Sequence, residues 1–215
     1  EGFSGFLEGY ADASTDRPDA AKASFAKAAG ESFGSPELAY ECVLAMRSIG
    51  HPVPALFLFN TLTNRAGKDA EFWFEYTLTA AAAKDPEATL VGAEKAYGLG
   101  NKRAAYIHNY ASALIVNRAD PAKALTLTLA RLQEDGNDRS AIINHVFALM
   151  QNGYLAQVET LLKRLSGEDL RPDESADLQL AWFEYYVLTK KHPLARVAYN
   201  NLETGRMFPN QIRWA

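Results

Sequence analysis

Only one cysteine, Cys42, occurs among the 215 residues of this chain, so no disulfide can form within it. The most apolar run, ALFLF at residues 55–59, is far too short to cross a bilayer. Basic residues form no cluster, and the net charge of −4 arises from both signs spread along the chain. We therefore expect no nucleic-acid partner and no direct insertion into a membrane.

Motifs for catalysis and metal binding are missing as well. The chain contains no HExxH, CxxC or GxSxG motif and no P-loop. GLGNKR at residues 98–103 has two glycines, but no strand precedes it and the third glycine is missing, which indicates a helix end and a turn. Cys42 lies in the apolar stretch LAYECVLAM and is expected to be a buried small side chain, not a nucleophile. The sequence thus predicts no catalytic residue, no metal site and no cofactor.

Helix signals dominate, whereas the alternation typical of strands is nearly absent. Three predicted helix starts place a capping side chain before a proline: Ser35-Pro36, Asp85-Pro86 and Asp120-Pro121. Further N-cap candidates are Asp69, Asp138 and Asp173. Glycines at or just past predicted helix ends are Gly30, Gly50, Gly67, Gly100, Gly136, Gly153, Gly167 and Gly205.

These signals divide the chain into twelve helices that are joined in pairs by short turns. The predicted ranges are 3–14, 18–29, 36–49, 53–65, 70–84, 86–98, 103–117, 121–134, 139–152, 154–165, 173–190 and 193–204. The first helices of successive pairs begin 33 to 36 residues apart. A period of that length, filled by two helices and a turn, is typical of a stacked helical array.

The fifth pair, AIINHVFALMQNGYLAQVETLLKRL, resembles a tetratricopeptide repeat (TPR). The matching residues are Ile142, His145, Val146 and Leu149 on the first helix, Gly153 at the turn, and Val158, Leu162 and Leu165 on the second helix. In the terminal pairs, the corresponding residues include Phe3, Phe6, Leu7 and Tyr10, and Trp182, Phe183, Tyr186 and Tyr199. The family's consensus Trp, Gly and Tyr are often replaced, so the period and the paired helices carry the resemblance, which covers almost the whole chain.

The resemblance implies an all-α fold, a right-handed superhelix (α-solenoid) of about six antiparallel, TPR-like helix pairs. Two short helices cannot bury their apolar faces alone, and stacking the pairs builds a continuous core. The implied repeats are residues 3–34, 35–68, 69–101, 102–137, 138–171 and 172–205. We expect residues 1–215 to form a single domain that is a fragment of a longer chain, with the first helices lining a concave groove.

Two asparagines fall at equivalent places in adjacent pairs. A shift of 35 residues lays Asn109 on Asn144, whereas His108 falls on Ile143. The histidines are therefore not equivalent, which indicates one repeated unit and argues against a His–His catalytic or metal pair. His145 falls at a core position and is expected to be a neutral, packed imidazole with one hydrogen-bond partner.

An asparagine inside a helix is mildly unfavourable, so two at one register require a reason. In TPR-like proteins, an Asn at this place faces the groove, where its amide can hold a ligand's backbone through a donor and an acceptor. A hydrogen bond to the neighbouring helix is the alternative, and the sequence leaves both open. The same register places Tyr40, Leu44, Phe74, Leu78, His108, Ile143, Phe147 and Leu180 in the groove. Pairs three and four fit two registers almost equally well.

Most of these predicted groove residues are apolar, and an exposed apolar stripe usually marks a partner surface. Some TPR modules hold a C-terminal carboxylate in a basic clamp that needs several Lys and Arg side chains, but Arg47 is the only candidate here. We therefore expect a non-enzymatic scaffold whose groove binds an extended or helical, partly apolar segment of a protein or peptide client.

Two alternatives to this function remain open. The array could serve as an architectural spacer, or as a dimerisation arm that forms a homodimer, within a larger polypeptide. Six helix pairs could also close into an α/α-toroid, a form used by some carbohydrate-processing enzymes, although those sites need longer loops and paired carboxylates. Neither client nor pathway follows from the sequence, and the bacterial cytoplasm and periplasm both fit.

Overall fold

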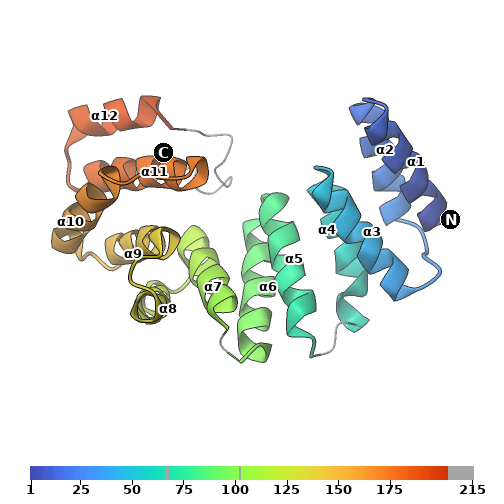
Figure 1. The fold of residues 1–215 in the computed structure, drawn as a ribbon, viewed down its shortest axis with the longest axis horizontal. Coiled ribbons are helices and arrows are strands. Elements are labelled where there is room, and N and C mark those ends of the chain that lie inside the picture. The colour runs from blue at the N-terminus through green and yellow to red at the C-terminus, as the bar shows by residue number, and fades with distance from the viewer. Residues whose placement is uncertain (66–67, 102, 203–215) are drawn as a thin grey trace. The chain divides into compact units, whose positions relative to one another are not determined.

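The computed structural model describes residues 1–65, 68–101 and 103–202, which form twelve α-helices and one 3-10 helix, with no strand among them (Figure 1). The helices are α1 Gly2–Ser14, α2 Pro18–Ala29, α3 Pro36–Ser48, α4 Pro52–Leu62, η1 Thr63–Arg65, α5 Ala70–Ala82, α6 Pro86–Leu99, α7 Ala104–Asn117, α8 Pro121–Glu134, α9 Arg139–Gln151, α10 Leu155–Ser166, α11 Pro172–Leu188 and α12 His192–Asn200. Each odd-numbered α-helix packs against the helix that follows it. The predicted all-α fold of consecutive helix pairs is therefore confirmed.

Capping side chains explain where several helices begin. Ser35 Oγ accepts a hydrogen bond from the Leu38 N–H at 3.1 Å. Asp85 and Asp120 each accept one at 2.9 Å from the N–H of the residue three positions later, Ala88 and Lys123. The proline that follows each cap has no N–H to leave unsatisfied in the first turn. These three predicted helix starts are confirmed, as are the caps at Asp69 and Asp138.

The predicted cap at Asp173 is wrong. Helix α11 begins one residue earlier, at Pro172, so Asp173 lies inside its first turn. Glu174 takes the reciprocal role, because its Oε2 accepts a hydrogen bond from the Arg171 N–H at 3.0 Å. An acidic residue in the first turn still favours the helix through the positive end of its dipole.

Helix ends also follow the predicted glycines where the structure describes them. Gly50 and Gly153 have φ of 87° and 79°, a left-handed conformation that a residue with a Cβ adopts only at a cost. Helix α12 ends at Asn200, earlier than the predicted residue 204. The predicted stops at Gly67 and Gly205 lie outside the described residues.

The chain forms two compact units, Glu1–Gly100 and Asn101–Ala215, called here the first and second units. In the first unit, α4 packs against both α2 and α5. The aromatic ring of Phe59 on α4 is fully buried and lies edge-on to the rings of Phe72 and Tyr76 on α5, at centroid distances of 4.8 and 5.5 Å. This aromatic cluster joins the second and third pairs.

The first pair departs from the predicted register. Phe6 is buried as expected, but Phe3, Leu7 and Tyr10 are 38 to 51% exposed. Helix α1 instead turns its glycines, Gly2, Gly5 and Gly9, towards the core. A Cβ on Gly9 would lie 2.6 Å from the ring of Phe25, so the close approach of α1 and α2 requires glycine there.

In the second unit, α9 packs against α7 on one side and α11 on the other, and α8 and α10 also contact it. Two polar side chains at the end of α9 link the fifth pair to the fourth. Gln151 Nε2 donates a hydrogen bond to the Ile115 carbonyl, and Asn152 Nδ2 donates one to the Pro121 carbonyl, both at 2.8 Å. In the last pair, Phe183 is buried, but Tyr199 is 48% exposed and the predicted core residues Trp182 and Tyr186 are only half buried.

Glu159 of α10 holds α11 through a charged hydrogen bond. The Tyr185 hydroxyl donates to Glu159 Oε2 at 2.6 Å, and Lys163 Nζ lies 2.8 Å from Oε1. Lys163 and then Tyr185 lower the pKa of the Glu159 carboxyl from 4.5 to about 2. Because the folded pKa is depressed, this contribution to stability is present above pH 4.5 and is lost as the pH falls towards 2.

We expect Glu159→Gln to flatten the acid-induced loss of stability between pH 4.5 and about 2. Denaturant unfolding at a series of pH values would measure this for the wild type, the variant and a control, Glu8→Gln, which changes an exposed carboxylate of α1. An equally steep loss in Glu159→Gln and the wild type would show that this carboxylate does not contribute.

Candidate functional site

Asn109 and Asn144 lie on adjacent first helices of the second unit, α7 and α9, which pack side by side. Both side chains are half buried, and neither amide makes a hydrogen bond to any residue within the described ranges. A hydrogen bond from either amide to a neighbouring helix, which the sequence left open, is therefore not formed among those residues. Two equivalent amides keep their donors and acceptors available.

The less buried face of α7 continues beyond Asn109. Its half-buried residues include His108, Ser112 and Val116, spaced as neighbours on one side of a helix. The opposite side carries Ile107, Tyr110, Ala111 and Leu114, all buried in the core as the repeat pattern predicts. Asn109 is thus part of a half-open face, not an isolated polar residue in the core.

Three predicted groove residues are not accessible. Ile143, Phe147 and Leu180 are only 2, 7 and 5% exposed. Helix α9 is covered by α7, α8, α10 and α11, so little of its circumference reaches the surface. Ile143 and Phe147 are therefore covered by these neighbours, and Leu180, on α11, is buried as well, so none of the three side chains belongs to an accessible groove.

The predicted groove residues of the first unit are partly accessible. Tyr40 and Leu44 on α3, and Phe74 and Leu78 on α5, are half buried.

Arg47, the one candidate for a basic clamp, is engaged within the protein. Its Nη2 lies 2.6 Å from Glu75 Oε2, and its Nη1 donates to the Glu75 carbonyl and to Thr79 Oγ1, both at 3.2 Å. A guanidinium held this way ties α3 to α5 and has little left for a client's carboxylate.

His108 and His145 are both packed residues. His145 Nδ1 lies 2.9 Å from Thr128 Oγ1, and burial lowers the pKa of its imidazole, as expected for a neutral ring with one partner. Burial also lowers the pKa of His108, opposed by Asp138 and assisted by Arg131. Within the described ranges, no group of three or more His, Cys, Asp and Glu side chains could hold a metal ion. Cys42 is buried, which raises its thiol pKa to about 11.

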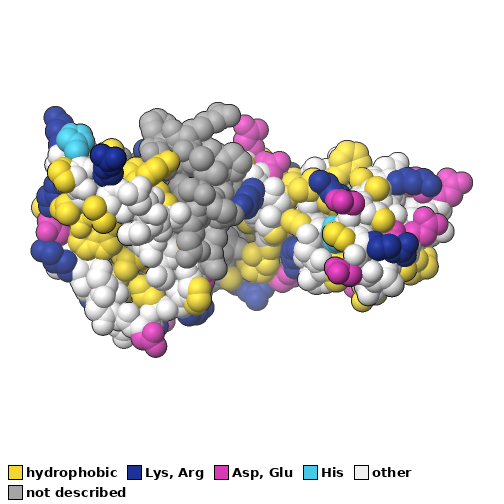
Figure 2. All heavy atoms as spheres, turned by 90° about the horizontal axis from the view of Figure 1, so that it is seen from above, with side chains coloured by type: hydrophobic (Ala, Val, Ile, Leu, Met, Phe, Trp, Pro, Cys, Tyr) yellow, Lys and Arg dark blue, Asp and Glu magenta, His cyan; other side chains and the backbone are white. Residues whose placement is uncertain are grey.

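Apolar surface is also exposed away from α7 and α9. At the end of α11 and on α12, 45 to 61% of each of several apolar side chains is exposed, and Figure 2 shows such side chains gathered near α12. They are Val187, Leu188, Leu194, Val197 and Tyr199.

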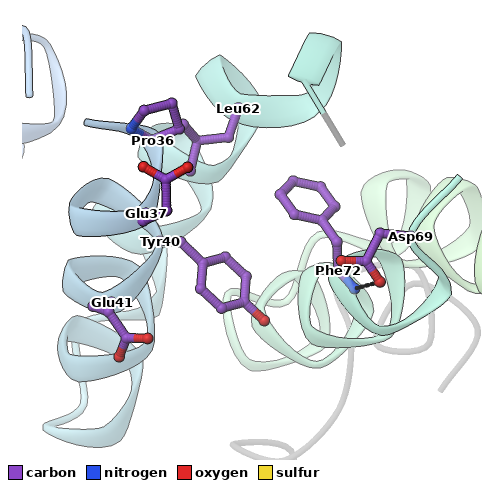
Figure 3. A pocket seen from close by; sticks show the side chains of 7 residues that line it. All are labelled: Pro36, Glu37, Tyr40, Glu41, Leu62, Asp69 and Phe72. Carbon is purple, nitrogen blue, oxygen red and sulfur yellow. Dashed lines mark hydrogen bonds between the residues drawn. The ribbon is translucent and has the colours of Figure 1, made fainter. Parts of the chain in front are cut away.

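A pocket of ≈330 Å³ that the sequence did not predict lies between α3 and α5 (Figure 3). Its lining residues are Pro36, Glu37, Tyr40, Glu41, Leu62, Asp69 and Phe72. Only Tyr40 was a predicted groove residue. The spacing of Glu37, Tyr40 and Glu41 at three and four residues on one helix was the available signal, since such residues share a face.

Comparison with known proteins supports the fold. One solved structure with a similar fold is PilF from Pseudomonas aeruginosa, with a TM-score of 0.51, 13% sequence identity, and coverage of 99% of this chain and 96% of that chain. PilF is a TPR-containing protein, so the similarity confirms the TPR-like fold class. No protein-family model matches the sequence, and no curated protein matches it either. None of the described helices is both long and apolar enough to span a membrane.

Proposed function

We propose that the chain is a non-enzymatic scaffold for protein–protein interaction, and that the accessible faces of its first helices bind an extended or helical, partly apolar segment of a partner. The observation that carries this proposal is the pair of amides on α7 and α9, Asn109 and Asn144. They occupy equivalent positions, are half buried, and make no hydrogen bond to another described residue. An Asn inside a helix is mildly unfavourable, and two at equivalent positions with available donors and acceptors can hold the backbone of a partner.

The spacing of the two helices suits a peptide backbone. Helices packed side by side lie about 8–10 Å apart, and an extended chain advances about 3.3 Å per residue. Equivalent side chains on α7 and α9 therefore meet backbone groups about two to three residues apart along an extended partner. Each amide offers both a donor and an acceptor, as a strand partner would.

We further propose that the six predicted repeats act together as one binding domain, supported by their common period.

The test compares the double variant Asn109→Ala/Asn144→Ala with the wild type in affinity capture, followed by titration of the purified partner. Loss of two hydrogen-bonding amides should weaken binding by about tenfold or more. The free energy of unfolding of the variant should stay within about 0.5 kcal/mol of the wild-type value or rise slightly, because Ala favours a helix more than Asn. The matched control is Gln133→Ala/Gln157→Ala, which removes two exposed amides from α8 and α10, the second helices of the same pairs.

Each outcome separates one interpretation from another. Weakened binding with an intact fold supports the proposed contact of the Asn109 and Asn144 amides with the partner's backbone, called here the amide ladder. Loss of stability together with binding would show that the asparagines are structural. Binding equal to that of the control would remove this face from the proposal and leave the spacer or dimerisation arm, which light scattering of the purified chain would then distinguish.

A further inference from the structure

The pocket between α3 and α5 combines aromatic rings with carboxylates, and we call it the acidic aromatic pocket (Figure 3). Tyr40 from α3 and Phe72 from α5 stack with their ring centroids 6.0 Å apart and their planes 24° from parallel. The ring of Phe59 lies edge-on to both, at centroid distances of 5.7 Å from Tyr40 and 4.8 Å from Phe72. Phe72 is only 7% exposed, so the half-buried ring of Tyr40 supplies most of the accessible aromatic surface.

Carboxylates surround these rings. Glu37 and Glu41 are exposed on the same face of α3 as Tyr40, and Asp69 lies across the pocket at the start of α5. One oxygen of Asp69 accepts hydrogen bonds from the N–H groups of Glu71 and Phe72, at 2.9 and 3.3 Å. The other oxygen of Asp69 and the whole carboxylate of Glu41 make no hydrogen bond or ion pair within the part of the chain that the structure describes.

The electrostatic field in the pocket is negative. Burial, and then the charges of Glu75, Asp69 and Glu71, raise the pKa of the Tyr40 hydroxyl to about 12, with Arg47 acting in the opposite direction. The hydroxyl is therefore protonated at neutral pH and adds no charge of its own. Two basic residues are close to the pocket in the structure or the sequence. Arg47 is already paired with Glu75, with Nη2 2.6 Å from Oε2, and Lys68, which precedes Asp69 in the sequence, is exposed.

The charge of the whole unit has the same sign. Residues 1–100 contain 14 acidic and eight basic residues, whereas residues 101–215 contain 12 acidic and 14 basic residues. The negative balance of the chain thus comes entirely from the unit that holds the pocket. Such a field steers a cationic partner towards this unit and repels an acidic one.

We infer that the acidic aromatic pocket binds a basic side chain, preferably arginine, of a partner polypeptide. This rests on the proposed function, because it assigns one anchor of the client. A cation is attracted to an aromatic face within about 6 Å of the ring centroid, and carboxylates at the rim add charge-assisted hydrogen bonds. The two rings lie too close together for a group to enter between them, so the guanidinium stacks on the open face of Tyr40 at the mouth. Arginine is preferred because its planar group can stack and bind a carboxylate at once.

A small probe tests the pocket without knowledge of the client. N-acetyl-arginine N-methylamide would be titrated into the full chain carrying ¹³C-labelled Tyr and Phe rings, with the signals of Tyr40 and Phe72 followed by NMR. The neutral citrulline counterpart has nearly the same shape and hydrogen-bonding groups but no charge. We expect saturable shifts of both ring signals with the arginine probe, with a Kd in about the millimolar range, and little movement with citrulline.

Two variants locate the effect. Glu41→Gln should weaken the arginine probe by about twofold to fivefold, as expected for loss of one exposed ion pair. Glu8→Gln removes the same charge from an exposed position on α1 of the same unit and should leave the Kd unchanged. Equal shifts with citrulline, no saturable shift, or equal effects of the two variants would overturn the inference. A lysine probe that binds more tightly would overturn the preference for arginine.

The probe experiment and the asparagine experiment can fail separately. If the arginine probe does not bind but Asn109→Ala/Asn144→Ala still loses the partner, only the pocket inference is wrong. If the probe binds but the asparagine variant keeps its partner, the amide ladder is wrong and the pocket stands as a separate cation site.

Discussion

Replacing Phe59 by Ala should lower the free energy of unfolding by about 3–5 kcal/mol. The side chain is completely buried on α4 and contacts the rings of Tyr40, Phe72 and Tyr76 at centroid distances of 4.8 to 5.7 Å. The substitution removes the transfer free energy of the ring and leaves a cavity that three rigid aromatic neighbours cannot fill. Because Phe72 and Tyr76 lie on α5, much of the cost falls on the packing between the second and third pairs, which is what holds a stacked array together.

The matched control is Phe57→Ala, two residues away on the same helix, where the side chain is 58% exposed. Its free energy of unfolding should change by no more than about 0.5 kcal/mol. Urea unfolding followed by circular dichroism would measure both variants. A similar cost for the two substitutions would mean that the aromatic cluster does not hold the second and third pairs together.

Gly92→Ala should destabilise the protein by about 1–3 kcal/mol, although alanine favours a helix interior by about 1 kcal/mol. A Cβ at position 92 would lie 2.7 Å from Thr77 Oγ1 and from Tyr76 Cδ1, and 3.2 Å from the Thr77 backbone nitrogen. Thr77 is buried, and its hydroxyl donates to the Trp73 carbonyl at 2.7 Å. Relief of the clash therefore requires α5 and α6 to move apart, not a single side chain to rotate.

Gly98→Ala is the control for this prediction, because it lies on the same helix with open space around the position of its Cβ. Here the gain in helix propensity is unopposed, and we expect a stability that is unchanged or raised by up to about 1 kcal/mol. Thermal unfolding of the two variants under identical conditions would check the difference in sign. A gain at both positions would show that α5 and α6 are less closely packed than the structure indicates.

The helices could be predicted from the sequence because their start signals are local. Each cap accepts a hydrogen bond from a backbone N–H only three residues later in the chain, as Ser35, Asp85 and Asp120 do. No distant residue is therefore needed to place those helix starts. The same holds for the left-handed stops at Gly50 and Gly153. Periodicity then identified the pairs, since each pair repeats the same local pattern.

Burial could not be predicted equally well, because it depends on neighbours that are far apart in the sequence. Phe3 and Leu7 fit the repeat pattern but remain exposed, because α1 packs its glycines against α2 instead. Ile143 and Phe147 looked accessible, but the helices around α9 cover them. The pocket at Tyr40 and Phe72 was missed because it forms only when α3 and α5 meet.

The most direct test of the scaffold function is site-specific photocrosslinking in the native host. A photoreactive benzoylphenylalanine would replace Ser112, which shares the half-open face of α7 with Asn109, and in a second protein it would replace Thr126, which is exposed on α8. If the α7 face holds a partner, position 112 gives a discrete protein adduct that position 126 does not give. That protein, once purified, binds the wild-type chain and binds Asn109→Ala/Asn144→Ala more weakly. Adducts that are absent at 112, or the same at both positions, would contradict a binding role for this face.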